Sequence, residues 1–429
     1  MRIEINYGRG HLEVELPEDA EVTLIGKPAM PALADPISEV EQALARPVGA
    51  PSLAELARGR NSACILICDI TRPVPNGLVL PSLIRQLLAA GLAPESIKVL
   101  VATGLHRPNE GDELAEVVGD PWVLETVEVA NHFARNDADH LDLGLTPGRH
   151  TRVRLDRRLV EADLRIATGL VEPHFMAGYS GGRKVIAPGV AHAETITTFH
   201  SARFMEHPKA ANCVLDGNPL HEEQLEVVRM LGEAYAVNTV INDDRELAFV
   251  NFGEIVESHL EAVAYARGFA EVPVPERFAT VLTSAAGYPL DKTYYQTVKG
   301  MVAPLEILAP GGDLIIASAC SEGMGSEHFV DAQRRLVESG ADAFLDEISV
   351  KSHADIDEWQ TEMQLKPMRV GAIHLYSDGL SGPARDLTGV NMVADLGRAV
   401  AASLERSGER RLAVIPEGPY VVPVWRPAA

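Results

Sequence analysis

Residues 63–75 read Ala63-Cys64-Ile65-Leu66-Ile67-Cys68-Asp69-Ile70-Thr71-Arg72-Pro73-Val74-Pro75. The first six residues are apolar without a break, which is typical of a strand buried on both faces of a parallel sheet. The strand runs directly into a polar turn, and residues 77–90 then follow the pattern of an amphipathic helix. A buried strand, a turn and a helix in this order form the repeating unit of an α/β fold.

The same alternation continues along the chain. In the first part, strands are expected at 97–102 and 164–167, and helices at 191–203, 221–231 and 254–267. Residues 272–276, Val-Pro-Val-Pro-Glu, are the best candidate for a linker because prolines favour an extended path. Beyond them, strands are expected at 280–283, 314–319 and 369–376, helices at 294–307, 331–338, 355–365 and 394–405, and a turn at 310–312.

We therefore predict an α/β protein of two α/β domains with mainly parallel sheets and an active site in the interdomain cleft. The N-terminal domain is expected over residues 1–272 and the C-terminal domain over 277–415. An irregular tail, rich in proline, is expected over residues 416–429.

Composition limits the partners of this chain. The 61 acidic residues exceed the 38 basic ones and give a formal charge of −23. Such a surface repels phosphate backbones and anionic lipids, so neither nucleic acid nor a membrane is expected as a partner. The four cysteines form no Cys-x-x-Cys pair, and no apolar run approaches the roughly 18 residues of a membrane span. Residues 2–5 alternate like a strand and do not resemble a secretion signal, so we expect a cytoplasmic protein.

Residues with polar or ionisable side chains follow three of the predicted strands. Asp69, Thr71 and Arg72 come directly after the first strand, and His106 lies in the Thr-Gly-Leu-His-Arg segment after the second. A third polar segment follows the strand at 164–167. Because ligands in open parallel sheets lie just beyond the carboxyl ends of the strands, these segments suggest one convergent site.

The third segment reads His174-Phe175-Met176-Ala177-Gly178-Tyr179-Ser180-Gly181-Gly182-Arg183-Lys184. Its glycines relax the backbone and allow it to approach a ligand closely. They place Lys184, a cation that becomes a strong nucleophile when desolvated, at the end of the loop. His200 follows on the helix expected at 191–203. A glycine-rich turn with incidental histidines explains each residue singly, but it explains the whole cluster poorly.

Single residues outside this segment carry weaker signals. Arg72 offers a planar fork for a carboxylate or phosphate, with Asp69 available to orient it. His106 could act as a general base, although a solvated loop histidine is as common. Gln296 and Lys299 share one face of a predicted helix, and a solvated helix face is the usual meaning of such a pair.

Several familiar motifs are missing. The glycines before Lys184 lack the spacing of a P-loop, and Val185 stands where a P-loop has Ser or Thr. The chain contains no His-Glu-x-x-His motif and no Gly-x-Gly-x-x-Gly after a strand. A protease-type zinc site and a standard nicotinamide site therefore have no support.

Taken together, the segments at 69–75, 103–108 and 174–184 resemble the nickel-pincer lactate racemase family. His200, the Gln296/Lys299 pair and Trp359 add to the resemblance. It implies a nickel-pincer nucleotide, Ni(II) pyridinium-3-thioamide-5-thiocarboxylic acid mononucleotide, attached through Lys184. Members of this family interconvert 2-hydroxy acids by moving the C2 hydrogen to and from that cofactor as a hydride.

The resemblance also implies a role for each matching residue. His200 would be the protein ligand of the nickel, and His106 and His174 would be the two acid/base residues. Arg72, Gln296, Lys299, Tyr295 and Trp359 would position the substrate, and cofactor contacts would come from Thr71, Tyr179, Ser180, Gly181, Gly182 and Arg183. The size of the substrate pocket would depend on residues such as Met176 and Tyr294.

The expected function is therefore that of an isomerase, a racemase or epimerase of a lactate-like 2-hydroxy acid. The partners implied are the small-molecule substrate and the enzymes that build the cofactor. Three alternatives stay open at this point: a sugar-acid C2 epimerase of the same family, a pyridoxal-phosphate enzyme with Lys184 as its Schiff base, and a non-catalytic nickel- or nucleotide-binding accessory protein.

Overall fold

The structure is a computed structural model that describes residues 1–427. The chain forms two compact units that do not follow its order. One unit, here called the central unit, comprises Ala29–Phe199 and His207–Gly268. The other, the terminal unit, comprises Met1–Pro28, His200–Glu206 and the chain from Phe269 onward. The boundary near residue 268 lies close to the expected end of the first domain, whereas residues 1–28 and 200–206 pack with the second half of the chain.

The central unit is built on a six-stranded sheet of order β13-β12-β9-β4-β5-β6. All neighbouring strands are parallel except β12 and β13. The strands are β4 (Ala63–Cys68), β5 (Ile97–Ala102), β6 (Glu128–Asn131), β9 (Leu164–Leu170), β12 (Tyr235–Ile241) and β13 (Leu247–Glu254). Two antiparallel pairs accompany them: β7 (His140–Leu145) with β8 (Arg152–Asp156), and β10 (Pro173–His174) with β11 (Gly178–Tyr179).

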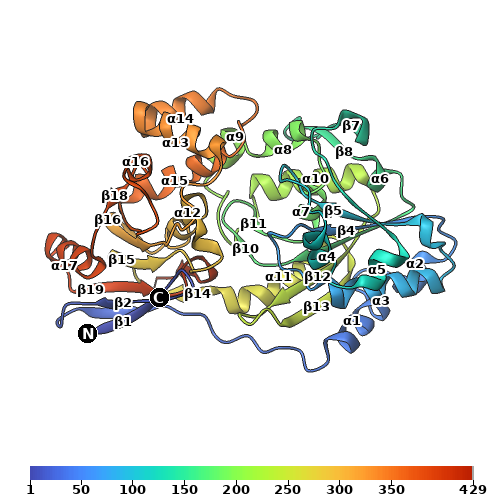
Figure 1. Ribbon diagram of the computed structural model, residues 1–429, viewed down its shortest axis with the longest axis horizontal. Helices are drawn as coiled ribbons and strands as arrows, with labels where there is room; N and C mark the ends of the chain where they lie inside the picture. The colour runs from blue at the N-terminus through green and yellow to red at the C-terminus, as the bar shows by residue number, and fades with distance from the viewer. Residues whose placement is uncertain (428–429) are drawn as a thin grey trace. The chain divides into compact units, whose positions relative to one another are not determined.

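The helices of this unit are labelled in Figure 1. They are α1 (Pro36–Ala45), α2 (Leu53–Ala57), α3 (Asn76–Ala89), α4 (Asp112–Val118), α5 (Pro121–Thr126), α6 (Arg157–Val160), α7 (Arg183–Ile186), α8 (Ala193–Phe199), α10 (Pro219–Leu231) and α11 (Glu257–Ala270). Helix α7, which carries Lys184, contacts both β4 and β9.

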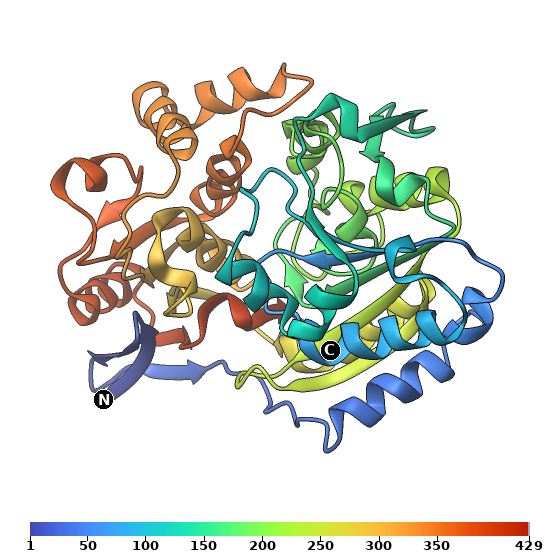
Figure 2. The same cartoon turned by 45° about the vertical axis from the view of Figure 1, so that its right-hand side comes forward.

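The terminal unit has its own six-stranded sheet, of order β18-β17-β16-β15-β19-β3, and all of its pairs are parallel. Its strands are β3 (Glu21–Leu24), β15 (Phe278–Ser284), β16 (Leu308–Ala317), β17 (Ala372–Tyr376), β18 (Asn391–Met392) and β19 (Arg411–Ile415). The N-terminal strand β3 therefore pairs with the late strand β19, and Figure 2 shows the blue start of the chain beside its red end.

Two further strand pairs and seven helices complete this unit as far as the structure describes it. The pairs are β1 (Arg2–Tyr7) with β2 (Gly10–Glu15), and β14 (Glu271–Val274) with β20 (Val422–Trp425). The helices are α9 (Ala202–Met205), α12 (Tyr294–Val302), α13 (Glu327–Ser339), α14 (Ala341–Ser349), α15 (Glu358–Val370), α16 (Gly382–Asp386) and α17 (Leu396–Ser407). The predicted α/β class with mainly parallel sheets is confirmed.

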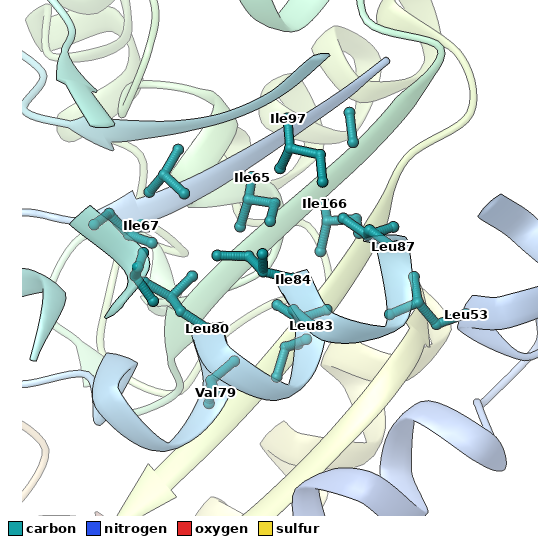
Figure 3. Packing of buried hydrophobic residues seen from close by; sticks show 14 of the residues in the cluster. Leu53, Ile65, Ile67, Val79, Leu80, Leu83, Ile84, Leu87, Ile97 and Ile166 are labelled. Atoms are coloured by element: carbon teal, nitrogen blue, oxygen red, sulfur yellow. The ribbon is translucent and has the colours of Figure 1, made fainter. Parts of the chain in front are cut away.

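The core of the central unit fixes the sheet edge at which the polar segments begin. Ile65 and Ile67 of β4 point to the same face because side chains alternate along a strand, and α3 covers that face with residues such as Leu83 and Leu87. These four side chains are fully buried (Figure 3). Burial of each such side chain contributes roughly 1.5–3 kcal/mol to folding. The polar turn after Cys68 therefore starts from a rigid strand.

Some expectations about secondary structure are wrong. The helix expected at 191–203 is two helices, α8 and α9, separated at His200 and Ser201. Ser201 has an extended backbone (φ −74°, ψ 154°) and begins α9, which is a position that serine favours. The turn expected at 310–312 lies within β16. Helix α14 was not expected.

A further error concerns the linker and the tail. The linker at 272–276 is extended as expected, but most of it is strand β14. Its partner β20 lies within residues 416–429, the segment that was expected to be irregular. The last two residues of that segment, 428–429, lie outside the described part. Proline is tolerated in such a two-stranded edge pair, so Pro273 and Pro423 do not prevent it.

Among residues 1–427, no helix is both long enough and apolar enough to cross a membrane.

Candidate functional site

The three chemically loaded segments of the central unit start at one edge of its sheet. Strand β4 lies between β9 and β5, and all three strands run in the same direction. The chain moves to one side of β4 through β5 and β6 and to the other side through β9 and β12. The carboxyl ends of β4 and β9 therefore flank a topological switch point, which is where open α/β sheets place their ligands.

His106 is held by a buried carboxylate. Its Nδ1 lies 2.6 Å from Oδ2 of Asp69, which follows β4. The other oxygen of Asp69 accepts hydrogen bonds from the hydroxyl (2.5 Å) and the backbone N–H (3.2 Å) of Thr71. The His106 side chain is 62% exposed and that of Asp69 only 6%. The ring is therefore anchored at Nδ1, which leaves Nε2 as the nitrogen that can exchange protons.

Asp69 stays ionised at neutral pH despite its burial. Burial alone would raise the pKa of this carboxyl group. The hydrogen bond and charge of His106, the hydroxyl of Thr71 and the charge of Arg72 outweigh that effect and lower the pKa below its usual value. Asp69 is therefore a charged acceptor for the hydrogen bond at Nδ1 of His106.

Arg72 forms an ion pair with Glu172, which follows β9. Both side chains are partly exposed, by 27% and 31%. A substrate carboxylate would therefore meet a guanidinium already engaged on one side. Glu172 was not singled out in the sequence, although its position two residues before His174 and directly after a strand was a usable signal.

His174 lies on the small β10–β11 hairpin, with 9% of its surface exposed. Its Nδ1 accepts the backbone N–H groups of Met176 (3.3 Å) and Ala177 (3.2 Å). The neutral ring therefore carries its proton on Nε2. In this arrangement Nε2 of His174 can donate a hydrogen bond, and the ring can accept a proton only after the hairpin backbone releases Nδ1.

The glycines after the hairpin are required by packing against the protein itself. Gly181 and Gly182 have φ values of +77° and +48°, a region that other residues rarely adopt. A Cβ atom on Gly181 would lie 2.7 Å from the side chain of Val171, and one on Gly182 would lie 2.8 Å from the ring of His259. Gly178 likewise has φ +78°. The expectation that these glycines admit a ligand is not needed to explain them.

Arg183 points into the protein. Its guanidinium is almost fully buried and donates hydrogen bonds to the backbone oxygens of Ala177 (3.1 Å) and Tyr179 (3.0 Å). Burial lowers its pKa to about 9. His259 approaches both Arg183 and the backbone oxygen of Ser180. Arg183 thus holds the backbone of residues 177–179 through hydrogen bonds from inside the protein. Its direct contact with a cofactor stays a prediction.

Lys184 lies at the start of a segment, residues 184–189, whose far end is hydrogen-bonded to the loop that carries His106. It lies in the first turn of α7, and its backbone N–H bonds to the oxygen of Gly181 (3.0 Å). Burial raises the pKa of the Cys68 thiol to about 11, and the charges of Arg72 and Lys184 oppose this. The charges of Arg72 and Lys184 therefore both reach Cys68, the last residue of β4. Five residues further on, the oxygen of Gly189 accepts the N–H of Gly104 (2.9 Å).

The remaining predicted cofactor residues of this unit have structural contacts. The hydroxyl of Ser180 donates to the backbone oxygen of Leu170 (2.7 Å). Tyr179 is fully buried, and the guanidinium of Arg267 lies 5.8 Å from its ring centroid. Thr71 is exposed, with its hydroxyl on Asp69.

A hollow of about 700 Å³ opens beside His106. It is lined by the loop after β5 and by the segment after β6, namely Gly104, Leu105, His106, Arg107, Pro108, His132, Phe133, Ala134, Arg135 and Asn136. The volume lies within the usual range for small-molecule sites. The exposed Nε2 of His106 is therefore next to a space that can take a small ligand.

The other predicted residues form a second group in the terminal unit. The rings of His200 and Trp359 lie 4.5 Å apart, between the break after α8 and the first turn of α15. The hydroxyl of Tyr295 bonds to Trp359 and Asp357, and burial raises its pKa. His200, Tyr295 and Trp359 therefore form one connected cluster.

Helix α12 supplies the polar side chains of this second group. Gln296 and Lys299 lie in it three residues apart, as expected. The buried Oε1 of Gln296 has no hydrogen-bond partner in the described residues, so it is ready to accept one from a ligand. Tyr294, by contrast, is fully buried, and its hydroxyl donates to Gln364 and to the backbone oxygen of Thr388.

Residues 1–427 contain no group of three or more His, Cys, Asp or Glu side chains that could hold a metal ion. A nickel ion that arrives with sulfur and carbon ligands of its own needs only one ligand from the protein, and imidazole suits nickel. A single imidazole, such as that of His200, would be enough for a cofactor that brings its metal with it.

Comparison with known proteins covers most of the chain. The sequence model described as "Lactate racemase N-terminal domain" matches residues 7–212, and that of the "Lactate racemase C-terminal domain" matches residues 275–423. A lactate racemase of Thermoanaerobacterium thermosaccharolyticum is 30% identical over 434 residues, which is 98% of each chain. A lactate racemase of Lactiplantibacillus plantarum is 34% identical over 291 residues, which is 68% of each chain.

Solved structures show the same likeness. The lactate racemase apoprotein from T. thermosaccharolyticum superimposes with a TM-score of 0.89 at 29% identity, over 99% of this chain and all of that one. A protein from Thermotoga maritima has a TM-score of 0.65 at 17% identity, over 91% of this chain and 98% of that one, and shows a shared fold alone.

Proposed function

Because the chain belongs to the lactate racemase family, we propose that it interconverts the two enantiomers of a short 2-hydroxy acid such as lactate. The observation that carries the proposal is the arrangement of Arg72, His106 and Lys184 at one edge of the central sheet. It supplies a cation for a carboxylate, a proton carrier fixed by a carboxylate, and an amine for covalent attachment.

The cofactor in this proposal is a nickel-pincer nucleotide bound to Lys184, with His200 as the protein ligand of the nickel. When bound, the cofactor supplies a carbon that takes a hydride from C2 and returns it. The rest is the work of this chain. Arg72 and Lys299 would bind the substrate carboxylate, and Gln296 would bind its hydroxyl through the unpartnered Oε1.

The two proposed proton carriers, His106 and His174, differ in how readily they can accept a proton in this structure. His106 has its Nδ1 on Asp69, so its Nε2 can take the hydroxyl proton of one enantiomer and return it later. His174 serves the other enantiomer in this proposal, and it must first give up the two backbone N–H groups on Nδ1. The β10–β11 hairpin is therefore expected to rearrange when that enantiomer binds.

The fate of the C2 hydrogen tests this function. Protein produced together with the cofactor-building enzymes should convert C2-deuterated L-lactate to D-lactate with the deuterium retained, because the hydrogen leaves and returns as a hydride. Mass spectrometry of the product measures the label, and nickel analysis of the same sample measures the metal. Rapid loss of deuterium to water would indicate a carbanion and would contradict the proposal, as would failure to interconvert any short 2-hydroxy acid.

Asp69→Asn should lower the racemisation rate on the order of 10²-fold, the low end of what loss of a proton carrier costs. The neutral amide no longer offers Nδ1 of His106 a charged hydrogen-bond acceptor, so the ring is held less firmly for proton transfer. Steady-state racemisation rates at one pH measure the effect. Asp163→Asn, an exposed carboxylate of the same unit, is the matched control. An unchanged rate in Asp69→Asn would remove Asp69 from the mechanism.

A further inference from the structure

Residues 200–206 are a short arm that packs on the terminal unit although the chain on both sides of it belongs to the central unit. Figure 1 shows α9 of this arm, in green, beside the orange helices α14 and α15. Ala202 enters an apolar cluster with side chains of those helices, including Leu365 and Phe344. At its start the arm carries His200, whose ring lies against Trp359.

The far end of the arm carries a carboxylate that faces a second carboxylate. Glu206 directly follows α9, and Glu362 lies on α15 with only 1% of its surface exposed. The two side chains are close enough for a hydrogen bond to form between them if one of them carries a proton. Yet Oε1 of Glu206 and Oε1 of Glu362 are both buried and have no donor among the described residues. An ionised carboxylate is an acceptor only, so two of them cannot satisfy one another.

One shared proton resolves this conflict. A protonated carboxyl group donates its O–H to the neighbouring carboxylate, and both orphaned oxygens then have a partner. Two carboxyl groups that face each other in a buried site commonly bind one proton between them, because both cannot ionise at such close range. Oε2 of Glu206 accepts from Arg369 (2.7 Å), which favours Glu206 as the ionised member and Glu362 as the protonated one.

The other charges around the pair support this assignment. Burial raises the pKa of Glu362 well above its usual value, and the charges of Glu206 and Glu358 act in the same direction. Lys366, one turn further along α15, opposes them, but its own pKa is lowered by burial. Glu358 is itself paired with Lys351, and Arg335 of α13 also binds it. Arg335 and Lys351 are therefore engaged with Glu358, and burial acts against the charge of Lys366.

We propose that Glu206 and Glu362 share one proton and thereby clasp residues 200–206 to α15, which positions His200 against Trp359. Its value for catalysis rests on the proposed function, in which His200 is the nickel ligand; the clasp itself does not depend on that function. Glu206 and Glu362 are positioning residues, since neither is expected to touch substrate or cofactor.

The first test detects the proton directly. The infrared spectrum of the metal-free protein at pH 7 should contain the carbonyl stretch of a protonated carboxyl group. Glu362→Gln should lose that band. Glu338→Gln, which removes an exposed carboxylate from α13 of the same unit, should keep it. Absence of the band from the wild type, or its persistence in Glu362→Gln, would overturn the proposal.

The second test reads the docking of the arm. The chain has three tryptophans, so Trp122→Phe with Trp425→Phe leaves Trp359 as the only one. Its emission should differ between this background and His200→Ala, which removes the contacting ring. Glu362→Gln should keep the parent emission because an amide N–H can donate to Glu206, whereas Glu362→Ala should move toward the His200→Ala value. Parent-like emission in Glu362→Ala, or a shifted one in Glu362→Gln, would contradict the clasp.

The sign of the pH dependence follows from the raised pKa of Glu362. Between the ordinary pKa of a glutamate and this raised value, the native state holds a proton that the unfolded state has released, so docking weakens as pH rises. Emission of the parent should approach the His200→Ala value at alkaline pH, and that of Glu362→Gln should stay constant. If the infrared band disappears with rising pH while the emission does not change, the proton does not hold the arm.

Nickel content separates this inference from the proposed function. In protein produced with the cofactor, Glu362→Ala should retain less nickel than Glu362→Gln. If Glu362→Ala releases the arm by the fluorescence test but keeps all its nickel, the clasp stands and the role of His200 as ligand falls. If the arm stays docked, the clasp falls whatever the nickel content shows.

Discussion

Lys184→Ala should carry no cofactor and racemise nothing. In the proposed function this lysine is the only covalent anchor. It lies close enough to Cys68, the last residue of β4, for its charge to act on that thiol together with the charge of Arg72. Alanine keeps the helical start of α7, because the backbone bond to Gly181 does not involve the side chain. Intact mass spectrometry of protein made with the cofactor-building enzymes should show an adduct on the wild type and none on the variant. The racemisation rate should fall to that of cofactor-free protein.

Lys209→Ala is the matched control for this result. Lys209 is a half-exposed lysine from the same unit, and its ammonium pairs with Asp216 at the surface. That variant should keep the adduct and the rate. An adduct that persists in Lys184→Ala, or full activity of an unmodified wild type, would show that the attachment site was wrongly assigned.

Alanine variants of the three histidines should fail in different ways. His106→Ala should keep the adduct and the nickel but lose roughly 10²–10⁴-fold in rate, because one enantiomer loses the group that exchanges its hydroxyl proton. His174→Ala should lose a similar factor. His200→Ala should instead lose nickel while Lys184 can still be modified. Metal analysis, intact mass and enantiomer conversion, measured on each variant, distinguish the two kinds of failure.

His150→Ala serves as the control, since that histidine is exposed and lies in the turn between β7 and β8. A wild-type rate in His106→Ala would exclude His106 as a proton carrier. Full nickel content in His200→Ala, with the arm shown to be folded, would exclude His200 as the ligand.

The sequence predicted best those elements whose signal is local. Strands β4 and β5 have the bounds that their unbroken apolar runs indicated, and α3 is displaced by one residue. The pairing of β14 with β20 was not predicted, because its energy comes from a partner about 150 residues away. The break at His200 was missed for the same reason: the apolar periodicity continues across it, and the interaction that bends the chain is with α15.

The site shows the same division. The rule that ligands gather beyond the carboxyl ends of parallel strands brought Asp69, His106 and Lys184 to one edge, and the structure places them there. The ion pair of Arg72 with Glu172 and the facing carboxyl groups of Glu206 and Glu362 were not predicted. On α15 the spacing of Glu362 and Lys366 is that of a solvated helix face, and only the arm that covers this face makes it a buried one.

The strand β3 gives the chain a fixed order of assembly. Among residues 1–427, its one partner in the sheet is β19, which lies nearly the whole length of the chain away. During synthesis on a ribosome, residues 29–268 emerge as a set that can fold, while the first 28 residues wait with an unpaired strand for the end of the chain. Residues 200–206 wait as well, until α15 has been made. The unit that holds Lys184 can therefore be complete while His200 is still without its docking surface.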